Sequence, residues 1–324
     1  MTTEKKLNIV RYTKENKSQW DSFVANSRNG TFLLMRDYME YHRERFNDHS
    51  MLFFYGKKII ALLPAHITDD ALCSHCGLTY GGLILSDGAT AALLLEIFEQ
   101  LTVYIKEQLK VTRLLYRPTP HIYHRYPCEE DLYALFRHNA TLTERKISSA
   151  ILLREPLPLS QLRKRKKSLA QASGITVAEE KSLDTFWQIL SDNLRERHNT
   201  KPVHTIEEIK YLQSLFPDNI RLFVASDRSG TTVGGALLYI TDRVAHVQYI
   251  ASTAEGRESG ALDALFDTLI HDTFVHKEYF DFGVSVEQGG HFLNNGLIFQ
   301  KEGLGGRGIC YDTYSVELKR DSND

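Results

Sequence analysis

The sequence predicts a mixed α/β chain built from two tandem domains of similar fold. The chain has 324 residues, which is long for a single hydrophobic core. Helix and strand signals follow the same order in both halves, and corresponding elements lie 166 to 169 residues apart. Side-chain identity between the halves is poor, so the pattern indicates a shared architecture rather than a sequence repeat. Two prolines in Arg154–Pro158 mark the join and predict domains 1–153 and 154–324.

The first half begins with a helix around Trp20 and then alternates short apolar runs with turn residues. The apolar positions of its long helix recur at three- and four-residue steps, which is typical of an amphipathic helix. In order, we expect a helix and a strand, a turn at Gly56-Lys57, two further strands, a long helix and a short strand: Trp20–Ser27, Met51–Tyr55, Lys58–Ile67, Gly81–Leu85, Ala89–Lys110 and Arg113–Tyr116.

The second half repeats this order after a basic helix that Ser160 caps and Gly174 ends. Its helix with Trp187 precedes three strands, a long helix and two more strands: Ile220–Ala225, Thr232–Ile240, Val244–Ala251, Gly256–His276, Tyr279–Phe282 and Ile309–Leu318. Each domain is therefore expected to hold a mixed, mostly antiparallel central sheet flanked by helices. A chance alignment of common elements is the alternative interpretation.

Composition excludes several broad classes of protein. The net charge of −2 gives no general attraction to nucleic acid or to anionic membranes. Apolar runs fall short of the roughly 20 residues that a membrane span needs. Four cysteines do not form a disulfide framework in a chain of this length, and the charged N-terminus resembles no signal peptide. We therefore expect a cytoplasmic protein with no membrane span.

Four segments of the sequence resemble the FemAB-like branch of the GNAT acyltransferase superfamily, whose members carry two GNAT domains in tandem. Periodicity alone does not single out that fold; the resemblance does. It covers nearly the whole chain, through these stretches: Ser27–Asp48 with Ser74–Leu85, the basic helix Leu159–Val177, NLRERHNTKPVH (Asn193–His204), and the ending DFG, NNGLIFQKEGLGG and YDTY.

The resemblance implies transfer of an acyl or aminoacyl group from an activated ester or thioester to a primary amine, in peptidoglycan or polysaccharide synthesis. Lys301 matches the Fem-type lysine near the reacting carbonyl, although Gln300 is inserted into the usual Phe-Lys pair. An ammonium group in a desolvated cleft can stabilise the tetrahedral oxyanion. Arg197 matches an arginine that meets phosphate in the family. Around these two, we expect further substrate-binding residues: Lys201 and His204 beside Arg197, Tyr80 near the acceptor, and Glu287 as a candidate base.

Binding of coenzyme A depends on the loop before the long helix of the second domain. GNAT enzymes that use this cofactor bind its pyrophosphate there with backbone N–H groups. In Arg257–Leu262, Arg257 and Gly260 fit the pattern, whereas Leu262 replaces a small residue and Glu258 adds negative charge. We expect no tightly bound cofactor and an acyl donor that is either aminoacyl-tRNA or acyl-CoA.

Three other motifs have competing interpretations. The basic run Arg163–Lys167 is either a solvated helix surface or a contact for tRNA phosphates or a nucleotide-sugar substrate. Cys73 and Cys76 flank His75 with the spacing of a metal or redox motif. No second pair completes a zinc site, so we interpret the spacing as coincidental and expect no metal. Nucleophilic catalysis by Cys76 with His75 is disfavoured, because adjacent strand residues point to opposite faces. Asp281–Gly283 resembles a kinase triplet without the other kinase motifs.

The leading prediction is therefore an N-acyltransferase with an amine acceptor and an active site in the second domain. The first alternative is transfer from acetyl- or acyl-CoA to an amino sugar. The second is a scaffold or binding protein with a degenerate pair of GNAT domains, because no general base is obvious and the loop for coenzyme A is incomplete.

Overall fold

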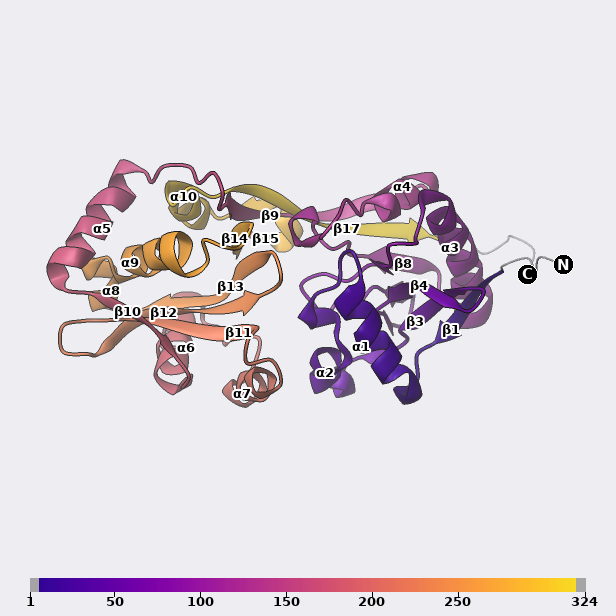
Figure 1. Ribbon diagram of the computed structural model, residues 1–324, viewed down its shortest axis with the longest axis horizontal. Coiled ribbons are helices and arrows are strands. Elements are labelled where there is room, and N and C mark those ends of the chain that lie inside the picture. The colour runs from indigo at the N-terminus through magenta and orange to yellow at the C-terminus, as the bar shows by residue number, and fades with distance from the viewer. Residues whose placement is uncertain (1–5, 319–324) are drawn as a thin grey trace. The chain divides into compact units, whose positions relative to one another are not determined.

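The computed structural model describes residues 6–318, with the side chains of 197 and 198 outside that description. The chain divides into two compact units (Figure 1). The first unit comprises Met1–Lys146 and Cys310–Asp324, and the second comprises Ile147–Ile309. The division thus falls before the expected boundary at 153/154, and the last strand contributes residues to the first unit. The long strands β9 and β17 each continue from one unit into the other.

The first unit contains two sheets and four α-helices among its described residues. The strand order is β1-β3-β4-β7 in one sheet, and β17-β8-β6-β5-β2 in the other. These elements have the following bounds: β1 Leu7–Arg11, α1 Lys17–Asn26, α2 Arg36–Met39, β2 Asn47–Asp48, β3 Met51–Tyr55, β4 Lys58–Leu63, β5 His66–Ile67, β6 Ala71–Cys73, β7 Ile84–Leu85, α3 Ala91–Tyr104, β8 Arg113–Tyr116, α4 Glu130–Arg137, β9 Thr141–Leu152 and β17 Arg307–Glu317.

The core of the first unit forms around the apolar face of α3. Leu94, Ile97, Phe98 and Leu101 are fully buried, as the periodicity predicts. They belong to one cluster with apolar residues of strands β3, β4 and β8. Burial of this helix face and the sheet residues opposite it supplies the main favourable free energy for folding this unit.

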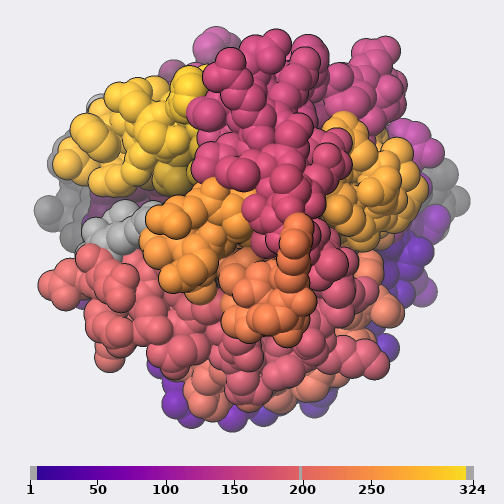
Figure 2. Space-filling model, turned by 90° about the vertical axis from the view of Figure 1, so that its left-hand side faces the viewer, coloured from indigo at the N-terminus to yellow at the C-terminus, as the bar shows by residue number. Residues whose placement is uncertain are grey.

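The second unit contains one sheet with the strand order β10-β11-β12-β13-β14-β9, together with a short hairpin of β15 and β16. Figure 2 views this unit from its end, where the pink helix α5 crosses the surface. Its elements have these bounds: α5 Gln161–Ser173, β10 Thr176–Glu180, α6 Asp184–His198, α7 Ile206–Leu215, β11 Ile220–Ser226, β12 Thr232–Ile240, β13 Val244–Ser252, α8 Ala254–Ser259, α9 Ala261–Thr268, β14 Tyr279–Val284, β15 Val286–Glu287, β16 Phe292–Leu293 and α10 Asn295–Gly303.

Most of the expected elements are present, and two of them are divided. The run Lys58–Ile67 forms two strands, because Pro64 lacks the N–H that a continuous ladder needs. The helix expected from Gly256 to His276 is also wrong as a single element. Gly260 adopts φ +77°, which ends α8 and begins α9, and the last turn at Leu269–Thr273 is a π-helix. The predicted caps of α5, Ser160 and Gly174, are confirmed.

Candidate active site

The site begins where two parallel strands separate. β13 and β14 pair in parallel from Val244–Tyr279 to His246–Asp281, and their described register ends there. β13 continues to Ser252 and β14 to Val284. Beyond the last pair, a cavity of about 350 Å³ lies in the second unit. The separation leaves backbone groups of both strands available to a ligand instead of to each other.

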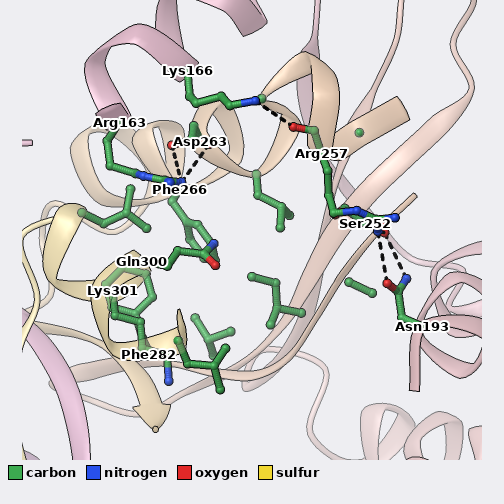
Figure 3. Close-up of a pocket in the computed structure, with 18 of the residues that line it drawn as sticks. Arg163, Lys166, Asn193, Ser252, Arg257, Asp263, Phe266, Phe282, Gln300 and Lys301 are labelled. Carbon is green, nitrogen blue, oxygen red and sulfur yellow. Dashed lines mark hydrogen bonds and ion pairs between the residues drawn. The ribbon is translucent and has the colours of Figure 1, made fainter. Parts of the chain in front are cut away.

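Residues from seven helices and strands line this cavity, with apolar and polar side chains interspersed. Figure 3 shows Gln300 and Lys301 on one side, and Arg257 with Ser252 and Asn193 on another. The lining residues are Arg163 and Lys166 of α5; Leu190, Asn193 and Leu194 of α6; Val247, Ile250, Ala251 and Ser252 of β13; Gly256, Arg257, Gly260, Leu262, Asp263 and Phe266 around α8 and α9; Phe282 of β14; and Leu297, Gln300, Lys301 and Leu304 of the α10 region.

Lys301 is held in this cavity by two backbone carbonyl groups. Its Nζ donates to the carbonyl oxygens of Gly283, at 2.8 Å, and Val284, at 2.9 Å. Burial lowers the pKa of Lys301 to about 8, although the nearby carboxylate of Asp281 favours the charged form. An ammonium group has three N–H donors, so the two carbonyl groups leave one for a substrate. Burial thus brings the pKa of this amine closer to neutral pH, and the two carbonyl groups fix its position.

Asp281 shapes the backbone that holds Lys301. It is fully buried, and its carboxylate accepts hydrogen bonds from Ser148 Oγ, at 2.5 Å, and from the backbone N–H of Gly283, at 3.0 Å. Nδ1 of His246 lies 2.9 Å from its other oxygen. Gly283 takes φ +76°, which turns the chain at the end of the strand. Asp281 is thus a positioning residue that acts on Lys301 through Gly283.

Arg257 and Gly260 line the same cavity as Lys301. Nη1 of Arg257 donates to the carbonyl oxygen of Ser252, at 2.7 Å, and lies 3.4 Å from Oδ1 of Asn193. A Cβ atom on Gly260 would lie 2.5 Å from the carbonyl oxygen of Lys166, so α5 passes closely over this glycine. Only a residue without a side chain fits both the positive φ and the close approach.

The basic helix α5 turns three of its five consecutive cations toward α8 and α9. Arg163 forms an ion pair with Asp263, at 3.1 Å, and Lys167 forms one with Asp267, at 2.7 Å. Nζ of Lys166 donates to the carbonyl oxygen of Arg257 at 3.1 Å. Burial raises the pKa of Asp263, against the opposing effect of Arg163. Lys164 and Arg165 are exposed, whereas the other three cations of the run are partly buried against α8 and α9.

Two of the three residues expected to bind phosphate, Lys201 and His204, lie away from this cavity. Lys201 and His204 line a second cavity of about 570 Å³, together with residues on a different face of α6. His204 is buried, and its Nδ1 lies 2.6 Å from the hydroxyl oxygen of Tyr249. The side chain of Arg197 lies outside the described part of the structure. The described residues of this group thus do not share the cavity of Lys301.

Tyr80 and Glu287, which were also expected at the substrate site, do not line either cavity. Tyr80 is buried in the first unit, where its hydroxyl donates to Thr31 Oγ1 at 3.1 Å and its ring packs on Tyr123. Glu287 is exposed on β15 and accepts a hydrogen bond from Nδ2 of Asn294 at 3.1 Å. Among the described lining residues of the two cavities above, neither side chain is present.

Sequence reasoning missed the support around Lys301 and the polar residues on the opposite wall. Asp281 was noted only as part of a kinase-like triplet, and Asn193 and Asp263 were not considered for the site. An aspartate at the end of an apolar strand, two residues before a glycine, is a pattern that the sequence does show. In the structure this pair forms the hydrogen bond that turns the chain. The pairing of Asp263 with Arg163, which lies 100 residues earlier, leaves no local signal in the sequence.

Comparisons with known proteins identify the second unit. The model of the Acetyltransferase (GNAT) domain family matches residues 159–290. Residues 159–290 of the second unit thus match a GNAT acetyltransferase domain. No curated protein sequence matches the chain. In the described residues, no helix is both long and apolar enough to cross a membrane.

Solved structures extend the likeness from this domain to the whole chain. FemX superposes with a TM-score of 0.68 at 12% identity, over 96% of this chain and 97% of its own. The C-terminal domain of a proposed lysylphosphatidylglycerol synthetase from Agrobacterium fabrum gives 0.58 at 13%, covering 94% and 92%. A tandem GNAT protein from the clavulanic acid biosynthesis pathway gives 0.51 at 11%, covering 98% and 100%. The expected fold of two GNAT-like domains in tandem is confirmed.

Proposed function

We propose that this acyltransferase moves an acyl or aminoacyl group from an activated ester or thioester to the primary amine of a cell-envelope precursor. The observation that supports this proposal most is Lys301, which lines the cavity and whose half-buried amine is fixed by the carbonyl groups of Gly283 and Val284. An amine in that setting can donate to the oxygen of a substrate carbonyl without moving first, which is the requirement for electrostatic stabilisation.

In the proposed mechanism, the neutral amine of the acceptor attacks the carbonyl carbon of the donor. The carbonyl oxygen then becomes negatively charged, and the remaining N–H of protonated Lys301 donates to it. Collapse of the tetrahedral intermediate expels the alcohol or thiol of the donor and leaves an amide. The proton lost by the acceptor passes to the leaving group or to solvent. Asp281 keeps the carbonyl of Gly283 in place throughout, so that Lys301 needs no reorganisation during the reaction.

The charges that line the cavity favour a donor with phosphate groups. Arg163, Lys166, Arg257 and Lys301 supply four cations, whereas Asp263 supplies one anion. Both donors carry phosphate groups, which lie next to the reacting ester in aminoacyl-tRNA and at the far end of the pantetheine arm in acyl-CoA. We favour the aminoacyl ester of tRNA, because Leu262 and the acidic residues around Arg257 depart from the loop that binds coenzyme A. The fold likeness to FemX and to a proposed lysylphosphatidylglycerol synthetase is consistent with that choice.

Transfer from acyl-CoA to an amino sugar is the second candidate. It is favoured by Arg257 and Gly260, which line the same cavity as Lys301. An extended thioester entering between β13 and β14 would bring its carbonyl toward Lys301 and its phosphates toward Arg257. The two candidates use the same wall for phosphate and differ in the donor.

A binding and turnover experiment tests both candidates. The purified chain is incubated with aminoacyl-tRNA, acetyl-CoA or longer acyl-CoA, and thermal midpoints are measured, because a ligand that binds only the native state raises the midpoint. Amide formation on a UDP-linked peptide precursor or an amino sugar is then followed by mass spectrometry. We expect a shift and product with aminoacyl-tRNA, and loss of product but not of binding in Lys301→Met. Full turnover in Lys301→Met would contradict the catalytic assignment, and Lys164→Met serves as the control.

A further inference from the structure

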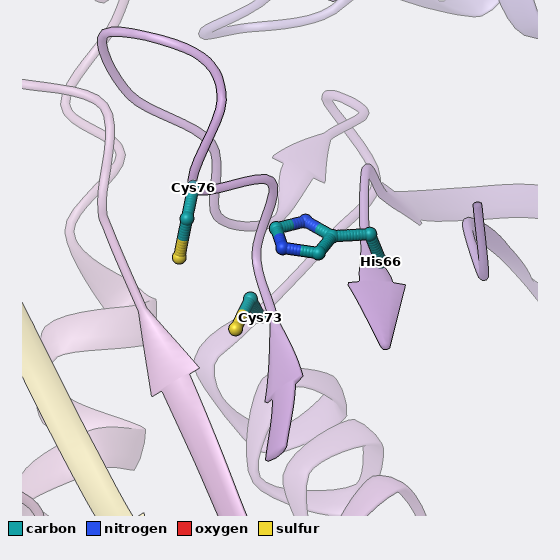
Figure 4. Close-up of side chains that lie close together, drawn as sticks. All are labelled: His66, Cys73 and Cys76. Atoms are coloured by element: carbon teal, nitrogen blue, oxygen red, sulfur yellow. The ribbon is translucent and has the colours of Figure 1, made fainter. Parts of the chain in front are cut away.

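A cluster of possible metal ligands lies in the first unit, separate in sequence from the acyltransferase domain. His66 of β5 is the antiparallel partner of Cys73 in β6. Directly opposed residues of a β-ladder project on the same face of the sheet, so this pairing brings the imidazole and the thiol together. Cys76 follows three residues later, after the chain has turned back. Figure 4 shows the ring of His66 pointing toward the two sulfur atoms.

The turn that carries both cysteines is fixed by the protein itself. His75 has φ +47°, and its N–H donates to the carbonyl oxygen of Cys73 at 2.7 Å. Arg117 holds the other end: its backbone N–H donates to Ser74 Oγ at 2.7 Å, and its Nη1 donates to the carbonyl oxygen of Cys76 at 2.9 Å. The two thiols are therefore presented by a rigid loop, as preorganised ligands would be.

The distances and burial suit a small tetrahedral ion. One ligand atom from each of His66, Cys73 and Cys76 lies within 4.8 Å of the other two. Zinc bonds of about 2.3 Å to sulfur and about 2.0 Å to nitrogen place tetrahedral ligand atoms roughly 3.5–3.8 Å apart. Rotation of the side chains, moving the ligand atoms by about 1 Å, would bring them to the tetrahedral spacing. His66 is 4% exposed, and its buried Nδ1 has no hydrogen-bond partner among the described residues.

We propose that Cys73, Cys76 and His66 form a zinc site. Two thiolates with one imidazole are a ligand set that zinc takes readily, and softer ligands disfavour magnesium or calcium. Binding releases the protons of both thiols. The fourth position is open to water or to His75, a buried residue whose ring centroid lies 5.5 Å from that of His66.

The ion would join the β5–β6 hairpin to the loop that follows it. Both strands are short, at two and three residues, and so make few ladder hydrogen bonds of their own. A metal that binds three points of such a segment stabilises the folded state because the unfolded chain does not hold these ligands together. The role is thus structural, and it is independent of the proposed acyl transfer.

The sequence pattern alone led to the opposite expectation. The sequence shows no second pair of metal ligands that would complete a site with the two cysteines. The third proposed ligand, His66, lies seven residues before Cys73 and faces it across the β5–β6 ladder. His66 lies two residues after Pro64, in a stretch that reads as an ordinary strand. Only the register of β5 against β6 brings it to the cysteines.

Metal analysis of the full-length chain tests the proposal. The protein is purified without a polyhistidine tag and under reducing conditions, and its zinc content is measured by mass spectrometry of the elements. We expect about one zinc ion per chain, with content falling at least tenfold in Cys76→Ser and in His66→Gln. Cys310→Ser removes an exposed thiol outside the cluster and is the matched control, which should keep its zinc. A stoichiometric ion other than zinc, or equal loss in the control, would overturn the assignment.

Cobalt substitution keeps the proposal testable if the variants fail to fold. Wild-type protein is treated with a chelator and then titrated with Co²⁺, whose absorption distinguishes tetrahedral thiolate coordination from hydrated ion. We expect saturation at about one equivalent, displacement by Zn²⁺, and a higher thermal midpoint with zinc than without it. Absence of the thiolate band would overturn the proposal. So would a Cys73–Cys76 disulfide that, once reduced, binds no metal.

Discussion

Replacement of Lys301 by methionine should change how the stability of the protein depends on pH. Methionine keeps most of the length of the side chain and removes the amine. Burial lowers the pKa of Lys301 from 10.5 to about 8. One pKa unit corresponds to about 1.4 kcal/mol, so keeping the ammonium charged in the cavity costs the folded state about 3 kcal/mol.

The sign follows from the protonation of the two states. Below pH 8 the amine is charged in both the folded and the unfolded chain, and the wild type bears the full cost. Above pH 10.5 it is neutral in both, and the cost is absent. Stability of the wild type relative to Lys301→Met should therefore rise with pH, by about 2 kcal/mol between pH 7 and pH 9.5. Loss of the hydrogen bonds to Gly283 and Val284 changes the stability difference between the two proteins by the same amount at every pH. It therefore leaves the slope of that difference against pH unchanged.

Urea unfolding of both proteins at several pH values measures this difference directly. Other titrating groups are shared by the two proteins, and their contributions cancel in the comparison. Lys164→Met, at an exposed position on α5, is the control and should keep the pH dependence of the wild type. A stability difference between Lys301→Met and the wild type that stays constant within about 0.5 kcal/mol from pH 7 to pH 9.5 would refute the argument that burial controls this lysine.

Three further substitutions test the surroundings of the cavity. Gly260→Ala should destabilise the chain by about 2–4 kcal/mol in urea unfolding, because the added Cβ meets the backbone of α5 and the residue has a positive φ. The control is Gly230→Ala, which also has a positive φ but has open space around its Cβ, and it should cost about 1 kcal/mol. Equal costs would show that the close approach is unimportant. Arg257→Glu should abolish the thermal shift given by a phosphate-bearing donor, and Lys164→Glu should retain it; a shift that persists in Arg257→Glu would remove this residue from the site. Asp281→Asn should cost about 2–4 kcal/mol and reduce turnover, since it weakens a buried set of hydrogen bonds that positions Lys301. An unchanged unfolding midpoint would contradict that role.

Local sequence signals predicted those elements whose ends are determined locally. The helix α5 begins after Ser160 and ends at Gly174, because a capping hydroxyl and a glycine at positive φ act within one turn of the helix. Strand β12 has the predicted bounds for a similar reason, since turns with glycine or a charged pair flank it. The break at Gly260 was missed, because its cause is the backbone of α5, which packs against it from about 90 residues earlier.

Predictions for the site depended on the resemblance more than on the residues themselves. The carried-over lysine, Lys301, and the loop residues Arg257 and Gly260 line one cavity, although their separation in sequence gives no reason to bring them together. Lys201 and His204 line a different cavity on another face of α6. Both residues follow the end of α6, where Asn199 turns the chain with φ +48°, and a match of sequence motifs does not determine the path of the chain beyond such a turn.

The carbonyl pair that holds Lys301 bears on which chemical role the lysine can take. A protonated amine uses two N–H groups on Gly283 and Val284 and keeps one for the substrate oxygen. A neutral amine has two N–H groups in all, so the same two carbonyl groups would occupy both and leave only a lone pair facing away from them. With a pKa of about 8, both forms are accessible near neutral pH, but only the charged form can stabilise an oxyanion. The geometry therefore links oxyanion stabilisation to the acidic side of this pKa and proton acceptance to the basic side. The direction in which turnover changes as pH passes through 8 consequently distinguishes the two roles, once the titration of the acceptor amine has been measured separately.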